Sequence, residues 1–316
     1  MSAPQSTASD LEQGHLTEVA EEVFAWIQPD GTWWINNAGI VASNDSVLVV
    51  DTCTTEQRTR SFLGAIAAAR PNGSLDFAVN THHHGDHTYG NCLLPEQTCL
   101  VGHELMRQGL LADTTLGSFP PFWSPRPTFG ELSLRAPNLT VQDSAAVHVG
   151  GTRRVDLLHP GYTAHTDGDL VVWVPDARVL FTGDLLFPGH TPMVMAGRPS
   201  GALESLHWMA ALQPEVVVPG HGEILTASEF TQTLEEHADY YRFVLQESRR
   251  GLAAGLTQLE VARTADLSGW QHLLDPERFV LNVHAGYAEL GAGPVVRAEA
   301  LADAVAWLGH PIVTHV

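Results

Sequence analysis

The chain contains no lysine, and all 16 of its basic residues are arginine. Chemistry that needs a primary amine is therefore excluded, including Schiff-base catalysis, pyridoxal phosphate attachment and the phosphate-loop lysine. The 36 acidic residues give a formal net charge of −20, and the arginines form no long basic run. Because nucleic acids and anionic membrane surfaces are bound mainly by clustered positive charge, we expect neither as a partner.

Long apolar runs and paired cysteines are also lacking. No segment approaches the roughly 18 consecutive apolar residues of a membrane span, and the polar first residues do not resemble a secretory signal. We therefore expect a cytoplasmic protein with no membrane partner, in which residues 1–19 form a disordered leader. The three cysteines, Cys53, Cys92 and Cys99, have no paired spacing. This argues against a disulfide framework and excludes a cysteine-rich zinc module.

The first half of the chain alternates short apolar runs with turn residues, which is typical of β-strands. Helical spacing of apolar residues predicts helices at residues 55–70 and 103–112. The prolines of residues 113–137 forbid regular structure. We interpret this stretch either as a lid or substrate wall, or as a surface loop pinned by two core aromatics. The expected strands are residues 23–27, 32–36, 46–51, 75–80 and 99–101.

The second half repeats this order of elements, with expected strands at residues 155–158, 169–174, 178–181 and 215–218 and a helix at 201–212. Two β-rich halves separated by helices predict an α/β fold, a four-layer αβ/βα sandwich in which two sheets pack face to face. Beyond it we expect helices only, at residues 229–250, 258–266, 276–290 and 298–307. We therefore divide the chain into a main domain over residues 20–226 and a C-terminal helical extension of that domain over residues 227–316.

A dense group of histidines follows the expected strand that ends at Asn80, where residues 81–87 read THHHGDH. A loop that leaves a strand can direct alternate side chains to one point. His82 and His84 can thus face one metal ion while Asp86 and His87 face a neighbouring ion. Imidazole and carboxylate ligands favour zinc, with iron or manganese as alternatives. The simpler alternative is a histidine run that binds metal adventitiously or caps a helix.

This run matches the His-x-His-x-Asp-His signature of the metallo-β-lactamase superfamily, and the chain resembles that family over roughly residues 20–225. Three later motifs resemble further family positions: His165 in GYTAHTDGD, Asp184 in LFTGDLLF and His221 in VPGHG. The resemblance implies two adjacent metal sites, with two zinc ions per chain. One ion is held by His82, His84 and His165, the second by Asp86, His87 and His221, and Asp184 bridges the two.

The resemblance also implies supporting residues and a mechanism. Asp51, which ends the run SVLVVD, would orient a metal ligand, and His83 would point away from the metals in a structural or supporting role. A hydroxide shared by the two cations would attack an electrophile whose oxygen the metals polarise, because zinc lowers the pKa of bound water to about 7. Asp86 would orient this hydroxide and take up a proton, which makes it the catalytic residue.

The bridging position separates branches of the superfamily. β-Lactamases typically have cysteine or serine where this chain has Asp184, and the surrounding stretch is closer to the glyoxalase-II-like and lactonase-like branches. We therefore expect a hydrolase that acts on a small ester, thioester or lactone. Glutathione as part of the substrate is disfavoured, because the helical extension carries only six arginines and no lysine. The alternatives are a persulfide-dioxygenase-like oxidoreductase with one iron, or a sulfatase, dehalogenase or β-lactamase.

Aromatic residues supply candidates for the substrate pocket, namely Trp33, Phe122, Trp123 and Tyr162, although buried core packing is the commoner role of such side chains. The expected helix at residues 276–290 has an apolar face. That face could pair two subunits into a homodimer or cover the cleft, and it consists of Phe279, Val280, Val283 and Tyr287.

Overall fold

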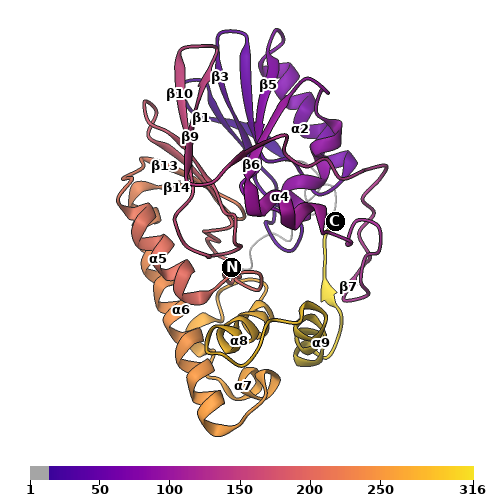
Figure 1. Cartoon of the computed structure of the whole chain (residues 1–316), viewed down its shortest axis with the longest axis vertical. Coiled ribbons are helices and arrows are strands. Elements are labelled where there is room, and N and C mark those ends of the chain that lie inside the picture. Colours follow the sequence, from indigo (N-terminus) through magenta and orange to yellow (C-terminus); the bar gives the residue numbers. More distant parts are fainter. Residues whose placement is uncertain (1–13) are drawn as a thin grey trace, which may run out of the picture.

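The computed structural model describes residues 14–316 and confirms the four-layer α/β architecture, with two sheets face to face and helices on their outer faces (Figure 1). The first sheet has seven strands in the order β1-β2-β3-β4-β5-β6-β8. They are β1 (His15–Ala20), β2 (Val23–Ile27), β3 (Ala38–Ser43), β4 (Ser46–Val50), β5 (Ser74–Val79), β6 (Cys99–His103) and β8 (Leu139–Val141).

The direction of these strands positions the histidine-rich loop. Strands β1 to β4 are antiparallel, whereas β4, β5, β6 and β8 are parallel. Helices α2 (Glu56–Ala69) and α4 (Glu104–Leu111) lie in the connections after β4 and β6. The carboxyl ends of β4 and β5 therefore meet at one edge, where Asp51 and the loop that begins at Thr81 follow them.

The second sheet has the order β14-β13-β12-β11-β10-β9. Strands β12 and β13 are parallel and are joined through helix α5 (Pro199–Ala210), and the other pairs are antiparallel. Asp184 directly follows β12, and His221 follows β13. The strands are β9 (Ser144–Val149), β10 (Arg153–Leu158), β11 (Val171–Val174), β12 (Val179–Gly183), β13 (Val216–Pro219) and β14 (Leu225–Thr226).

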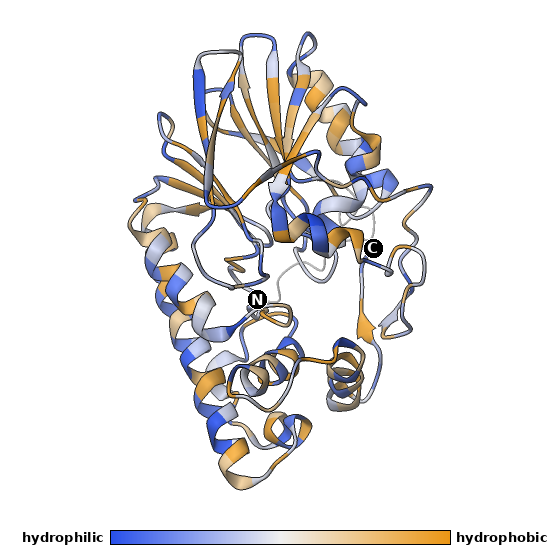
Figure 2. Ribbon diagram, viewed as in Figure 1, coloured by the Kyte–Doolittle hydropathy of each residue, from blue (hydrophilic) through white to orange (hydrophobic). Residues whose placement is uncertain are grey.

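Apolar side chains fill the spaces between the layers. Buried residues of both sheets, such as Val41, Leu48, Leu157 and Phe181, form the central core. Helix α2 covers the outer face of the first sheet with Phe62 and other residues of one apolar stripe. Figure 2 shows apolar residues along the strands and alternating hydrophobic and hydrophilic residues along the helices.

Helices α6 (Ala227–Ala254), α7 (Gln258–Thr264), α8 (Arg278–Glu289) and α9 (Arg297–Leu308) extend the molecule beyond the second sheet, with the short turn η2 (Ser268–Trp270) between α7 and α8 (Figure 1). Helix α6 begins with a capping box formed by Thr226 and Glu229. One apolar cluster joins this region to the second sheet, because it contains both Leu180 of β12 and Phe279 of α8. The division of the chain near residue 227 stays a prediction.

Two expectations about the fold are wrong, and burial argues against one of the two roles left open for an apolar face. Residues 15–19 belong to β1, which pairs with β2, so the predicted leader does not extend to residue 19; residues 1–13 lie outside the described residues. Residues 32–36 form a turn instead of a strand, because Gly31 and Trp34 both have positive φ angles. The apolar face expected to pair two subunits is already buried within the chain, which removes that argument for a homodimer; it comprises Phe279, Val280, Val283 and Tyr287.

A small third sheet ties distant segments together. Strand β7 (Trp123–Ser124) pairs in parallel with β15 (Ile312–Val313). Within residues 14–316 we find no helix with both the length and the apolar character that a membrane span requires.

Candidate metal centre

The structure brings the seven predicted metal ligands together. His82 and His84 lie in the loop after β5, and Asp86 and His87 lie on the short helix α3 (Gly85–Thr88). The remaining ligands, His165, Asp184 and His221, come from the loop before β11 and from the ends of β12 and β13. They form two groups whose candidate ligand atoms all lie within 4.8 Å of one another.

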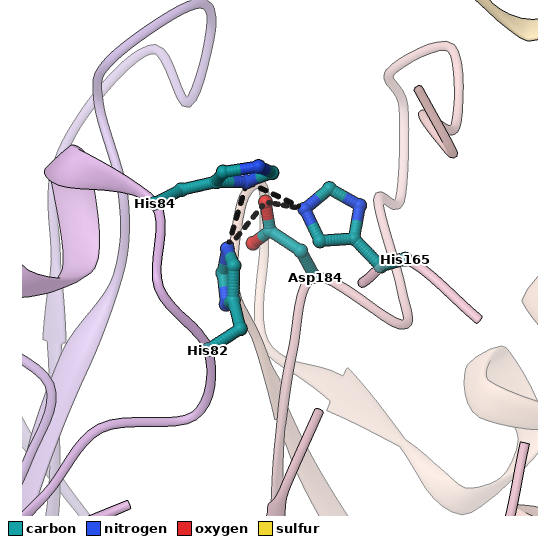
Figure 3. A group of neighbouring side chains, drawn as sticks. All are labelled: His82, His84, His165 and Asp184. Carbon is teal, nitrogen blue, oxygen red and sulfur yellow. Dashed lines mark hydrogen bonds and ion pairs between the residues drawn. The ribbon is translucent and has the colours of Figure 1, made fainter. Parts of the chain in front are cut away.

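The first group contains three histidines and one aspartate (Figure 3). His84 Nδ1 lies 3.1 Å from His82 Nε2 and 2.8 Å from His165 Nε2. Asp184 Oδ2 lies 3.6 Å from His82 Nε2 and 3.3 Å from His165 Nε2. The three imidazoles and the carboxylate therefore converge on one point.

The second group contains Asp86, His87 and His221. Asp86 Oδ2 lies 3.2 Å from His221 Nε2 and 3.9 Å from His87 Nε2. Asp184 reaches this group too, because its Oδ1 is 3.1 Å from His87 Nε2 and its Oδ2 is 3.5 Å from His221 Nε2. A single carboxylate thus contacts ligands of both groups.

Two buried atoms indicate that the groups are built for cations. Within residues 14–316, His87 Nε2 and Asp184 Oδ1 have no hydrogen-bond partner although they lie 3.1 Å apart. Buried polar atoms are nearly always paired with a partner, and both residues belong to the groups of candidate ligands. Imidazole nitrogens and carboxylate oxygens are ligands that suit first-row divalent ions. The residues present therefore fit a pair of such ions.

Hydrogen bonds on the far side of the rings fix their orientation. His165 Nδ1 donates to the carbonyl of Met193 at 2.6 Å, and His221 Nδ1 donates to the carbonyl of Gly31 at 2.9 Å. Since a carbonyl can only accept, each Nδ1 carries a proton, and Nε2 is the ring atom directed at the cluster. His84 is the exception, because it presents Nδ1 to the cluster.

Asp51 supports two ligands at once. Its Oδ2 accepts from His87 Nδ1 at 2.8 Å and from the Thr81 hydroxyl at 2.8 Å, and its Oδ1 accepts from the Thr81 amide. The Thr81 hydroxyl in turn accepts from His82 Nδ1 at 3.0 Å. Asp51 adopts a φ of 59°, in the left-handed region that aspartate tolerates better than most residues. This turn directs the carboxylate from the end of β4 toward the histidine loop.

Burial and charge separate the histidines into two classes. Burial lowers the pKa of both His82 and His84 well below the usual value, so both rings are neutral. Burial acts in the same direction on His221, but Asp184 and Asp86 outweigh it and raise its pKa to about 9. The pKa of His87 is likewise raised by nearby carboxylates against the effect of burial. The second group therefore holds protons that a cation must displace.

Gly220 allows the bridging carboxylate to approach the backbone. A Cβ atom at this position would lie only 2.0 Å from Asp184 Oδ1. The Gly220 amide also donates to the carbonyl of Gly183 at 2.8 Å, which joins the ends of β13 and β12. The glycine before His221 thus fixes the separation between two ligands.

A pocket opens beside the two groups. Asp86, Asp184 and His221 form part of its wall, as do Trp33 and Trp123, which were predicted to line it. Trp34, Tyr89 and Asp113 also line the pocket. The sequence did not predict the remaining wall residues, which are Phe187, Met193, Met195, Arg278 and Arg297. The pocket is therefore apolar over much of its surface, with two arginines in addition.

Three predicted residues lie elsewhere than expected. Phe122 does not line the pocket and packs against the outer side of Trp123 at 6.2 Å between ring centres, and Tyr162 is 40% exposed. His83 lines the pocket, and its ring centre lies 4.8 Å from that of His84, so the side chain faces the site and contacts one ligand. Burial, aided by His165 and Arg297, lowers the pKa of His83 to about 4, so its ring is neutral. The expectation that His83 points away from the site is thus wrong, whereas its contact with His84 agrees with a supporting role.

Arg278 is the most deeply buried charge of the pocket wall, with a side chain 2% exposed. Its guanidinium lies over the rings of Trp33 and Phe187, at 4.9 and 5.2 Å from their centres. It pairs with Asp275 at 2.7 Å, while Trp33 Nε1 donates to Glu277 Oε1 at 2.6 Å. These contacts join helix α8 to the turn that carries Trp33.

Comparison with known proteins supports this geometry. The family model of the metallo-β-lactamase superfamily matches residues 31–221, which include all seven ligands. Hydroxyacylglutathione hydrolases of Brucella ovis and Brucella abortus are each 30% identical over 173 residues, or 53% of this chain and 54% of theirs. The match therefore spans about half the length of these curated relatives.

Solved structures show the same fold. A metallo-β-lactamase from Pontibacter korlensis is 20% identical, with a TM-score of 0.56 over 71% of this chain and 99% of its own. The metallo-β-lactamase FIM-1 from Pseudomonas aeruginosa, in a mono-zinc form, is 16% identical, with a TM-score of 0.57 over 72% of this chain and 96% of its own. With the family model covering most of the fold and every ligand, the chain belongs to the metallo-β-lactamase superfamily.

Proposed function

We propose that the protein is a dizinc hydrolase of a small ester, thioester or lactone. The observation that carries this proposal is the position of Asp184, whose two oxygens lie 3.1 to 3.6 Å from histidine nitrogens of both groups. A carboxylate in that position suits two adjacent cations better than one. Two bound divalent cations would supply a hydroxide nucleophile at neutral pH and would polarise the oxygen of the bond to be cleaved.

The chain's own residues supply proton handling and substrate binding. Asp86 lines the pocket beside the second group. Burial acts to raise its pKa, but His87 and His221 lower it, so the carboxylate is ionised and can accept a proton at Oδ2. Trp33, Trp123 and their apolar neighbours exclude water from the substrate, which strengthens electrostatic interactions at the site.

A thioester is the substrate class that the relatives favour, since they are named hydroxyacylglutathione hydrolases. Two of the six arginines of the helical region, Arg278 and Arg297, reach the pocket, which the sequence did not predict. Arg297 forms no ion pair within the described part of the chain and could meet a substrate carboxylate. Glutathione thioesters therefore return to the set of substrates to be tested.

The test combines metal analysis with a substrate panel. Protein purified without an affinity tag would be analysed by plasma mass spectrometry, and assayed with a nitrophenyl ester, a glutathione thioester, a lactone and nitrocefin. Two variants address the centre: His84→Ala removes a ligand of the first group, and Asp184→Asn removes charge from the bridging position. Matched controls are His207→Ala and Asp239→Asn, whose side chains are 61% and 70% exposed.

We expect about two zinc ions per chain, and turnover of an ester, thioester or lactone that is lost in both variants and kept in both controls. One iron per chain with oxygen uptake from a persulfide would assign the protein to dioxygenase chemistry instead. Absence of tightly bound metal, or turnover unchanged by Asp184→Asn, would overturn the proposal.

A further inference from the structure

Residues 311–316, which we call the strap, run from helix α9 back to the body of the molecule (Figure 1). Strand β15 pairs with β7, so that Ile312 lies beside Trp123 and Val313 beside Ser124. The Ile312 amide donates to the carbonyl of Phe122 at 2.8 Å, and the Thr314 hydroxyl donates to the carbonyl of Pro125 at 2.8 Å. The strap thus holds the irregular segment between α4 and β8 at the point where Trp123 lies.

The far end of the strap binds a second segment. His315 Nδ1 lies 2.7 Å from Asp30 Oδ2, and the carbonyl of His315 accepts from Arg58 at 3.3 Å. Arg58 also donates to Gln28 Oε1 at 3.0 Å. The strap therefore contacts Asp30 directly and is linked to Gln28 through Arg58. Residues 28–30 lead directly into the turn that carries Trp33 and Trp34.

The two segments meet in the pocket wall. The ring centre of Trp123 lies 5.5 Å from that of Trp33 and 5.4 Å from that of Trp34, both in edge-to-face geometry. All three rings line the pocket. Outside the strap, these rings are joined by side-chain packing, which fixes a separation less strictly than directional hydrogen bonds do.

We propose that Thr314 and His315 are positioning residues of the substrate pocket, which hold Trp123 against Trp33 and Trp34 and so set the size of the group that the pocket accepts. This inference rests on the proposed function for its activity readout only. Trp123 belongs to a sheet of two two-residue strands, and such a short ribbon is not stable without further contacts. Loss of the strap contacts therefore lets Trp123 move relative to Trp33 and Trp34.

The strap does not touch the metal ligands. Its contacts within residues 14–316 are with the segment around Trp123, with Asp30, with Arg58 and with the apolar cluster beside α9. The nearest link to the centre passes through the backbone from Asp30 to Gly31, whose carbonyl accepts from His221. Loosening the strap should therefore alter substrate selection and leave metal content unchanged.

Paired variants separate a positioning role from general damage. Thr314→Val removes the hydroxyl with little change of shape, whereas Thr314→Ser keeps it. His315→Ala removes the donor to Asp30, whereas His315→Asn keeps an N–H close to the position of Nδ1. For each variant, kcat and KM would be measured with nitrophenyl acetate and with nitrophenyl benzoate, alongside metal content.

We expect Thr314→Val and His315→Ala to change the acetate-to-benzoate ratio of kcat/KM about three- to tenfold, as for loss of one hydrogen bond. The change should lie mainly in KM, metal content should stay at the wild-type value, and Thr314→Ser and His315→Asn should restore the ratio. A ratio unchanged in both disruptive variants, or one changed equally by their conservative partners, would overturn the proposal.

A second measurement does not depend on hydrolysis. Acrylamide quenching of tryptophan fluorescence in each variant, with and without Trp123→Phe, isolates the signal of Trp123, whose side chain is 4% exposed. Its quenching should rise in Thr314→Val and remain low in Thr314→Ser. If no ester, thioester or lactone is hydrolysed, the proposed function fails while this measurement still decides the role of the strap. Unchanged quenching of Trp123 would contradict it.

Discussion

The metal centre and the substrate pocket lie side by side but are built in different ways. Most ligands of the centre lie at strand ends or on a short helix, and the rings of His87, His165 and His221 are each held by a hydrogen bond to backbone or to Asp51. The pocket is formed by side chains from a turn, a long irregular segment and two late helices, which touch mainly through packing. Chemistry and selectivity are therefore separable, and a substitution in one region should leave the other nearly intact.

The largest effect is expected where a ligand is removed. His221→Ala should lower the metal content from about two ions to about one, because the second group loses one of three ligands. The value of kcat should fall by about a thousandfold or more, as for other residues that act as part of a catalytic unit. Metal analysis with steady-state kinetics checks this prediction, and His207→Ala is the control. A His221→Ala variant that keeps two ions would contradict the assignment of His221 as a metal ligand.

Support of the ligands should matter less than the ligands themselves. Asp51→Asn keeps the left-handed turn but replaces one acceptor oxygen by an amide, so that His87 Nδ1 and Thr81 compete for the oxygen that remains. We expect metal affinity to fall about ten- to a hundredfold. Titration against a chelator measures this loss, and the exposed Asp45→Asn should show none. Unaltered affinity would mean that packing alone orients His87.

A change in the pocket should appear in substrate preference only. Arg297→Gln is expected to lower kcat/KM for a glutathione thioester about three- to fivefold, the size of one exposed ion pair, with the effect declining as salt is added. A thioester without carboxylates should react as before. Arg249→Gln, on the exposed face of α6, provides the control. Equal losses on both thioesters would show that Arg297 acts on the centre and not on the substrate.

The smallest effect on the reaction is expected at His237, whose contribution is to stability behind the pocket. His237 is buried and accepts a hydrogen bond from the amide of Phe187 at 3.0 Å, and burial lowers its pKa to about 3. Below about pH 6.5 the unfolded chain binds a proton here that the native chain does not. The free energy of unfolding therefore falls toward pH 3, by at most about 1.4 kcal/mol per pH unit from this group. Urea titrations at several pH values from 7 to 4 measure this free energy. Its decrease with falling pH should be smaller in His237→Gln than in the wild type, and an identical decrease would contradict the prediction.

The contrast also explains what the sequence could predict. Spacing within one short motif predicted His82, His84, Asp86 and His87, whereas the family resemblance supplied His165, Asp184, His221 and Asp51. The strands and helices that position these residues were mostly predicted. The backbone carbonyls of Gly31 and Met193, which orient His221 and His165, could not be predicted, because any residue supplies a carbonyl. The hydroxyl of Thr81, directly before His82, could have been predicted to orient that ring.

The pocket could not be predicted in the same way. Trp33 and Trp123 were among the aromatic residues proposed for the pocket, but Arg278 and Arg297 reach it only through the packing of α8 and α9 on the main domain. Residues 113–137 partly satisfy both interpretations, since Phe119 and Phe129 are buried in the core while Asp113 and Trp123 line the pocket. Such long-range placement depends on tertiary contacts that no local pattern encodes.

Gly220 limits how the protein can change under selection. In a library that places every amino acid at this position, the Cβ atom of each replacement would collide with Asp184 Oδ1. A Cβ atom added at Gly269 would meet no atom within 4 Å, so that position should accept many replacements. Tolerance to mutation is thus set here by the space around one oxygen, and not by the chemistry of the residue itself. Laboratory evolution toward new substrates would have to proceed through the pocket wall and leave this backbone untouched.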